Sequence, residues 1–127
     1  MWVQRVGEHP AAVSGLRSSA EQYLSGCGAD ATAADVGLIM TELITNVIVH
    51  GGLPGQASIE VLDEVVRCEV SDAGTGMPQM KPIDPMRIGG NGLRLVAAFS
   101  ASWGVKCWSP EGKTVWCEVP RRAAPAA

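Results

Sequence analysis

Three short segments that lie far apart in this chain have polar residues or glycines next to apolar residues. TELITNVIVHG at residues 41–51 puts a polar stripe into an apolar helical pattern. DAGTGM at residues 72–77 puts an acid before a glycine turn, and GGNGLRLV at residues 89–96 puts glycines before a helical pattern. Any one of these features alone is weak evidence. Together they predict a pocket for a nucleotide such as ATP, assembled from three distant parts of the chain.

The apolar periodicity around these segments predicts both strands and helices. The expected elements are a strand at 2–6, helices at 10–24 and 32–50, a hairpin at 57–62 and 65–71, a helix at 92–99 and a second hairpin at 102–109 and 113–119. Thr32, followed by Asp35, resembles the capping box that begins a helix. Residues 72–90 hold seven glycines and prolines and no periodicity, which predicts a long loop. This order predicts an α+β fold, a two-layer sandwich with helices on one face of a mainly antiparallel sheet.

Length and composition limit what such a chain can be. With 127 residues, 46% of them hydrophobic, it can bury one core, so we expect a single domain at residues 1–120 and a flexible tail at 121–127. The net charge of -3 gives no indication of a surface for nucleic acid or a membrane. Because we find no signal-peptide pattern and no apolar run near the ~20 residues of a membrane span, we expect a cytoplasmic protein. The scattered cysteines predict buried reduced thiols rather than a zinc site or disulfides.

Glu42 and Asn46 are four residues apart in the second predicted helix, so both side chains project from one face. An amide oxygen such as that of Asn46 can join phosphate oxygens around Mg²⁺, which prefers oxygen ligands. Glu42 beside it could take a proton from an attacking nucleophile. The alternative is that both side chains simply face solvent.

Asp72 ends a predicted strand and precedes Gly74 and Gly76, whose backbones can approach a ligand closely. A carboxylate in this position can accept a hydrogen bond from the exocyclic amine of adenine. Guanine carries a carbonyl at that position, so the site is expected to select adenine over guanine. The alternative is an Asx turn that closes a hairpin.

Gly89, Gly90, Asn91 and Gly92 lead directly into a predicted helix that continues with Leu93. Free backbone N–H groups and the positive end of a helix dipole would meet there, which favours binding of phosphate. The segment is not a P-loop, because GxxxxGK followed by serine or threonine does not occur in the chain. The alternative is a flexible turn.

In order and spacing, the three segments resemble the N, G1 and G2 boxes of the GHKL ATPase superfamily. The boxes correspond to residues 42–50, 72–76 and 90–93, and GKTVWCEV at residues 112–119 is similar to the final strand of these proteins. Within the superfamily, the chain is similar to the small stand-alone anti-sigma-factor kinases common in actinobacteria. The resemblance spans nearly the whole chain and implies a Bergerat ATP-binding fold.

The resemblance also implies roles for individual residues. Asn46 would coordinate Mg²⁺, Glu42 would be the general base, and Asp72 would bind the adenine amine. The remaining nucleotide contacts would come from Gly74, Gly76, Met77, Gly90, Asn91, Gly92, Leu93 and, near the base through water, Thr114. The loop from Met77 to Gly89 would act as a lid. ATP and Mg²⁺ are therefore the expected cofactors.

The function implied by the resemblance is that of an ATP-dependent serine/threonine protein kinase, which phosphorylates an anti-sigma-factor antagonist and sequesters a sigma factor. Val49 and Asn91 stand where the actinobacterial relatives often have arginine. The first alternative is therefore a catalytically weak or inactive, nucleotide-gated protein-binding module of the same fold. The second alternative is the detached ATP-binding domain of a histidine kinase. The resemblance also implies a homodimer, for which the apolar first strand, with Trp2 and Val3, is the only hint in the sequence.

Overall fold

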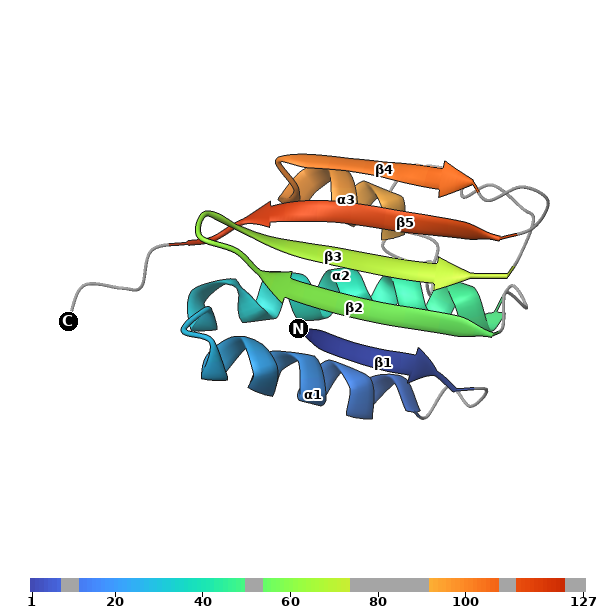
Figure 1. Ribbon diagram of the computed structural model, residues 1–127, viewed down its shortest axis with the longest axis horizontal. Helices are drawn as coiled ribbons and strands as arrows, with labels where there is room; N and C mark the ends of the chain where they lie inside the picture. Colours follow the sequence, from blue (N-terminus) through green and yellow to red (C-terminus); the bar gives the residue numbers. More distant parts are fainter. Residues whose placement is uncertain (8–11, 50–53, 74–91, 108–111, 123–127) are drawn as a thin grey trace, which may run out of the picture.

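The computed structural model describes residues 1–7, 12–49, 54–73, 92–107 and 112–122, and these form two layers. One layer is a five-stranded antiparallel sheet in the order β1-β2-β3-β5-β4, and the other contains three helices on one face of it (Figure 1). The bounds are β1 Trp2–Val6, α1 Ala12–Gly26, α2 Asp30–Val49, β2 Gly55–Val61, β3 Val65–Asp72, α3 Gly92–Phe99, β4 Ser102–Cys107 and β5 Lys113–Pro120. The α+β sandwich predicted from the sequence is confirmed.

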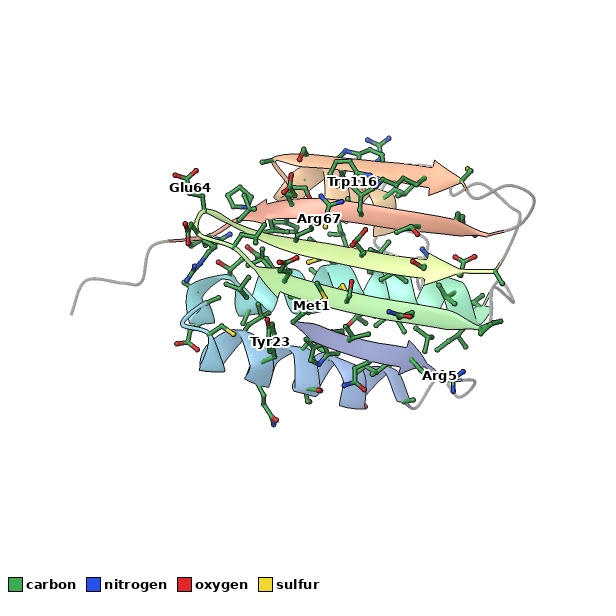
Figure 2. The ribbon with its side chains drawn as sticks, viewed as in Figure 1. Met1, Arg5, Tyr23, Glu64, Arg67 and Trp116 are labelled. Carbon is green, nitrogen blue, oxygen red and sulfur yellow. The ribbon has the colours of Figure 1, made fainter. Side chains whose placement is uncertain are left out.

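The two faces of the sheet differ in polarity, because side chains along a strand alternate between them. On the face that the helices cover, every second residue of β3 from Val66 to Val70 is buried. On the open face, Arg67 lies over the ring of Trp116, 4.7 Å from its centroid, and forms an ion pair with Glu118 at 3.8 Å (Figure 2). The alternation therefore determines which polar side chains near the strand ends can face the helices.

The helix α2 is the central element of the helix layer and contacts α1, α3 and the strands β1, β2, β3 and β5. Its residues Ile39, Met40 and Ile44 are almost fully buried. By length and composition α2 is apolar enough to span a membrane. This corrects the expectation that the chain contains no apolar run of that length. Half of that apolar window is buried inside the structure, so the composition of α2 is explained by its place in the core.

The start of α2 also differs from the prediction. The helix begins at Asp30, so Thr32 lies inside it and does not cap it. Thr32 is 1% exposed, and its Oγ1 accepts a hydrogen bond from the backbone N–H of Arg122 at 3.0 Å. The hydroxyl that resembled a cap in the sequence instead holds the chain segment after β5 against α2.

The first strand contributes its two end residues to the core and leaves the three residues between them exposed. Trp2 is 6% exposed, and its Nε1 donates a hydrogen bond to Oγ of Ser19 in α1 at 2.9 Å. Val3 points to the other side of β1 and is 46% exposed. Of the two residues that hinted at a dimer in the sequence, Trp2 is therefore used within the chain.

The cysteines divide into two pairs. Cys68 and Cys117 are buried opposite each other on β3 and β5, whereas Cys27 and Cys107 are exposed. The expectation of buried thiols is therefore confirmed for the first pair and wrong for the second. The hydrogen bond between the buried thiols, together with burial, raises the pKa of Cys68 well above its usual value. A raised pKa keeps this sulfur in the unreactive thiol form.

Candidate functional site

The polar stripe of α2 contains one atom that the fold leaves without a partner. Oε2 of Glu42 is buried and has no hydrogen-bond partner among the residues that the structure describes. Its polar neighbours differ: Oγ1 of Thr41 donates to the carbonyl of Gly37 at 2.8 Å, and Oγ1 of Thr45 donates to the carbonyl of Thr41 at 2.6 Å. The threonines are thus satisfied by their own helix, and the glutamate is not. Because buried polar atoms normally have partners, this oxygen suggests a site for a ligand or water.

Asn46, one turn further along α2, is partly exposed, so its side chain remains accessible to a ligand. Its amide oxygen and the free oxygen of Glu42 are the donor type that Mg²⁺ accepts. Among residues 1–7, 12–49, 54–73, 92–107 and 112–122, no group of three acidic, histidine or cysteine side chains could hold a metal ion. The oxygen donors of Asn46 and Glu42 fit Mg²⁺, which usually keeps several waters and binds substrate phosphates besides one or two protein ligands.

Asp72 forms a buried ion pair at the end of β3. Its Oδ1 accepts a hydrogen bond from Nζ of Lys113, the first residue of β5, at 2.9 Å. The two side chains are 5% and 16% exposed, respectively. They are register partners across the two strands, and Asp72 continues the alternation of buried residues that face the helices. An acid and a cation are thus placed together where the strands meet the helix layer.

Thr114 does not join Asp72. It is the register partner of Ser71, and the two hydroxyl oxygens are 2.8 Å apart. Because neighbouring residues of a strand point to opposite faces, the Ser71–Thr114 pair belongs to the open face of the sheet, whereas the Asp72–Lys113 pair belongs to the helix-covered face. The residue beside Asp72 in this register is Lys113, not Thr114. Lys113 was not among the predicted site residues, although the alternation of β5 after Gly112 could have indicated it.

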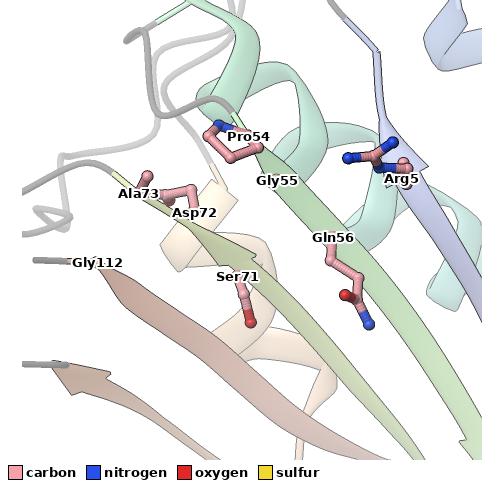
Figure 3. Close-up of a pocket in the computed structure, with 8 residues that line it drawn as sticks. All are labelled: Arg5, Pro54, Gly55, Gln56, Ser71, Asp72, Ala73 and Gly112. Carbon is pink, nitrogen blue, oxygen red and sulfur yellow. The ribbon is translucent and has the colours of Figure 1, made fainter.

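A pocket of about 350 Å³ opens at this end of the sheet (Figure 3). Its lining comes from the end of β1, the start of β2, the end of β3 and the residue before β5: Arg5, Pro54, Gly55, Gln56, Ser71, Asp72, Ala73 and Gly112. The side chains of Ser71 and Asp72 leave β3 in different directions (Figure 3). Of the predicted site residues that the structure describes, Asp72 is the one that lines this pocket, and Glu42 and Asn46 do not.

The C-terminal part of α2 nevertheless lies beside these strand ends. Gly55, the register partner of Asp72 in β2, has little room for a side chain. A Cβ there would lie 3.0 Å from Cγ1 of Val47 and 3.2 Å from the carbonyl oxygen of Ser71. Because Val47 directly follows Asn46 in α2, the polar stripe and the acid of β3 meet at the same end of the structure.

The glycine-rich segments are only partly described. The helix α3 begins at Gly92, and Leu93 in its first turn is 6% exposed and belongs to the core. The first backbone N–H groups of α3 have no acceptor within the helix, as at any helix start. The other predicted contacts, Gly74, Gly76, Met77, Gly90 and Asn91, lie outside the described residues, as does the segment from Met77 to Gly89 that was expected to form a lid.

The arrangement agrees with a comparison to known proteins. A family model of the histidine kinase-like ATPase domain matches residues 7–118. No curated protein matches the chain. The matched span contains the polar stripe of α2, the Asp72–Lys113 pair and the start of α3. The chain therefore belongs to the histidine kinase-like ATPase domain family and is a GHKL-type ATP-binding module.

Proposed function

We propose that this chain is an ATP-dependent serine/threonine protein kinase of the anti-sigma-factor type, which phosphorylates an anti-sigma-factor antagonist and sequesters a sigma factor. The observation that carries the proposal is the buried, unpartnered Oε2 atom of Glu42, one helical turn before Asn46. An unsatisfied buried oxygen costs stability, and such costs concentrate at functional sites. A general base needs an oxygen that is held in place but not already engaged in a hydrogen bond.

In the proposed reaction Glu42 accepts the proton of the substrate hydroxyl as that oxygen attacks the γ-phosphorus of ATP, the bond from the γ-phosphorus to the bridging oxygen breaks, and ADP leaves. Asn46 would hold Mg²⁺ through its amide oxygen, and Asp72 would accept a hydrogen bond from the exocyclic amine of adenine. When bound, Mg-ATP supplies the γ-phosphoryl group and the neutralisation of its charge. Because Glu42 belongs to a helix that is packed in the core, its carboxylate is positioned before the substrate arrives, which reduces the entropic cost of alignment.

The test is transfer of the γ-phosphate from Mg-ATP to a candidate antagonist protein, read as phosphoserine or phosphothreonine by mass spectrometry. We expect Glu42→Gln to reduce the rate of transfer by about 10² to 10⁴, the usual contribution of a general base, with little change in the affinity for Mg-ATP. The matched control is Glu64→Gln, which changes an exposed acid in the turn between β2 and β3 and leaves the rate unchanged. Equal rates in Glu42→Gln and the unmodified protein would overturn the assignment of Glu42 as the general base.

A second candidate function is a protein-binding module that does not turn ATP over. Val49, three residues after Asn46, is 66% exposed at the end of α2, so it offers an apolar contact to a partner beside the site. This function predicts that sigma-factor capture is the same in the unmodified chain and in Glu42→Ala and that no phosphate is transferred. The kinase instead predicts that phosphorylation of the antagonist changes the captured fraction. A pull-down of the unmodified chain and of Glu42→Ala, each with Mg-ATP and the antagonist, separates the two.

A further inference from the structure

The ion pair between Asp72 and Lys113 changes what the base-binding acid can recognise. Nζ of Lys113 lies 2.9 Å from Oδ1 of Asp72, and neither side chain is more than 16% exposed. A ligand that reaches the carboxylate therefore also meets an ammonium group. The site presents a hydrogen-bond acceptor and a cationic donor side by side, rather than an acid alone.

The neighbouring hydroxyls do not compete for this role. Ser71 and Thr114, the adjacent register pair, hydrogen-bond to each other at 2.8 Å and belong to the other face of the sheet. On the face with Asp72, its register partner is Lys113, which contributes a polar side chain. The base-reading surface at this end of β3 and β5 is thus built around a charged pair.

The two purines differ in what they offer to such a pair. Adenine presents an exocyclic amine, a donor, next to the ring nitrogen N1, an acceptor, whereas guanine presents the carbonyl O6, an acceptor, next to N1–H, a donor. A carboxylate alone matches the amine of adenine and is left facing the carbonyl of guanine. With an ammonium group beside the carboxylate, the carbonyl of guanine has a donor and its N1–H has an acceptor. Both purines then find complementary partners, which removes the penalty that would exclude guanine.

We infer that Lys113 sets the base specificity of this site and extends it to guanine, so that the module binds GTP as well as ATP. The inference rests on the proposed nucleotide site and names its ligand class more closely. In this role Asp72 accepts a hydrogen bond from the exocyclic amine of adenine or from N1–H of guanine, and Lys113 donates to N1 of adenine or to O6 of guanine. This inference differs from the expectation of strict adenine selection, which considered Asp72 alone.

The experiment is a calorimetric titration with Mg-ATP and with Mg-GTP of the intact chain and of three variants. Lys113→Met removes the donor, Lys113→Arg keeps a cationic donor, and Lys106→Met removes an exposed lysine from the neighbouring strand β4 as a matched control. We expect the intact chain to bind the two nucleotides within about tenfold of each other. Lys113→Met should weaken GTP binding at least about tenfold more than ATP binding, and Lys113→Arg should retain most of the GTP affinity. Lys106→Met should match the intact chain.

Thermal unfolding of each variant distinguishes loss of the donor from loss of the fold, and Lys113→Arg keeps the comparison informative if Lys113→Met unfolds. A preference for ATP of 100-fold or more in the intact chain would overturn the inference and leave the ATP site standing. An equal effect of Lys113→Met on both nucleotides would also overturn it. Binding of neither nucleotide by the intact, folded chain would overturn the proposed function together with the inference.

Discussion

Asp72 and Glu42 are both acids of the candidate site, but they differ in their hydrogen-bond partners. Asp72, at the end of β3, is 5% exposed and accepts a hydrogen bond from Lys113 at 2.9 Å. Glu42, in the middle of α2, has a buried Oε2 with no hydrogen-bond partner among the described residues. Both lie on elements that are packed together, since α2 contacts β3. The difference is therefore one of partners and not of location in the fold.

Because of this difference, we expect Asp72 to stabilise the fold and Glu42 to destabilise it. A buried carboxylate that accepts a charged hydrogen bond has its desolvation cost offset, and removing either partner leaves the other charge unmatched. A buried carboxylate oxygen without a partner keeps that cost. We therefore expect substitutions of the two acids to change stability in opposite directions, whatever they do to nucleotide binding.

The largest effect is expected for Asp72→Ala. Removal of the carboxylate leaves Nζ of Lys113 without its partner, and we expect the free energy of unfolding to fall by about 2 kcal/mol. This is less than the 3–5 kcal/mol typical of a fully buried pair, because Lys113 keeps 16% exposure. The affinity for Mg-ATP should fall by about 10- to 100-fold, the value of one hydrogen bond to a charged group. Urea unfolding and calorimetric titration measure the two quantities.

The matched control is Asp63→Ala, which removes an exposed acid from the turn between β2 and β3. It should change neither quantity by more than about 0.5 kcal/mol, as is usual for surface substitutions. If Asp72→Ala were as stable as the unmodified chain, the ion pair would not support the fold, and the contrast with Glu42 would disappear.

An intermediate effect is expected at Gly55, where the regions of the two acids touch. In Gly55→Ala the new Cβ would lie 3.0 Å from Cγ1 of Val47 and 3.2 Å from both the backbone oxygen of Ser71 and Cβ of Val6. Overpacking of this kind costs about 1–3 kcal/mol, and we expect the lower end of that range because the contacts of 3.0–3.2 Å require only small shifts. Because Val47 adjoins Asn46, the forced movement should also weaken the dependence of ATP binding on Mg²⁺. Gly15→Ala, where a Cβ meets nothing within 4 Å, is the control.

Urea unfolding compares the stability of the two glycine variants, and titrations with and without Mg²⁺ compare their binding. If Gly55→Ala lowers stability but leaves the effect of Mg²⁺ intact, the polar stripe of α2 and the end of β3 act independently. That result would break the link between the two acids that the packing at Gly55 suggests.

Much of the fold could be predicted from sequence because its elements have strong local patterns. The strand Trp2–Val6 and the helix Gly92–Phe99 have the bounds that alternation and helical spacing predicted. The start of α2 was predicted less well: Thr32 resembled a local cap, but its hydroxyl is used by Arg122, 90 residues away. Local sequence cannot show that a residue far along the chain will hydrogen-bond to a given side chain.

The candidate site shows the same division. Glu42 and Asn46 were identified because their spacing within one helix is a local property. Lys113 was missed because its meeting with Asp72 depends on the register between β3 and β5, across 41 residues of sequence. Thr114 was chosen instead, one position along the same strand. A shift of one residue exchanges the faces of a sheet, so Thr114 lies on the same strand as Lys113 but on the opposite face.

The smallest effect, and the one of opposite sign, is expected for Glu42→Gln. A neutral amide costs less to bury without a partner than a carboxylate, so we expect the free energy of unfolding in the absence of nucleotide to rise by about 0.5–1 kcal/mol. Asp72→Asn is the matched comparison, because the same chemical change there weakens the bond to Lys113 and should lower stability. Urea unfolding of both variants gives the two signs directly. A loss of stability in Glu42→Gln equal to that in Asp72→Asn would mean that both acids support the fold, and the buried oxygen of Glu42 would no longer indicate a catalytic role.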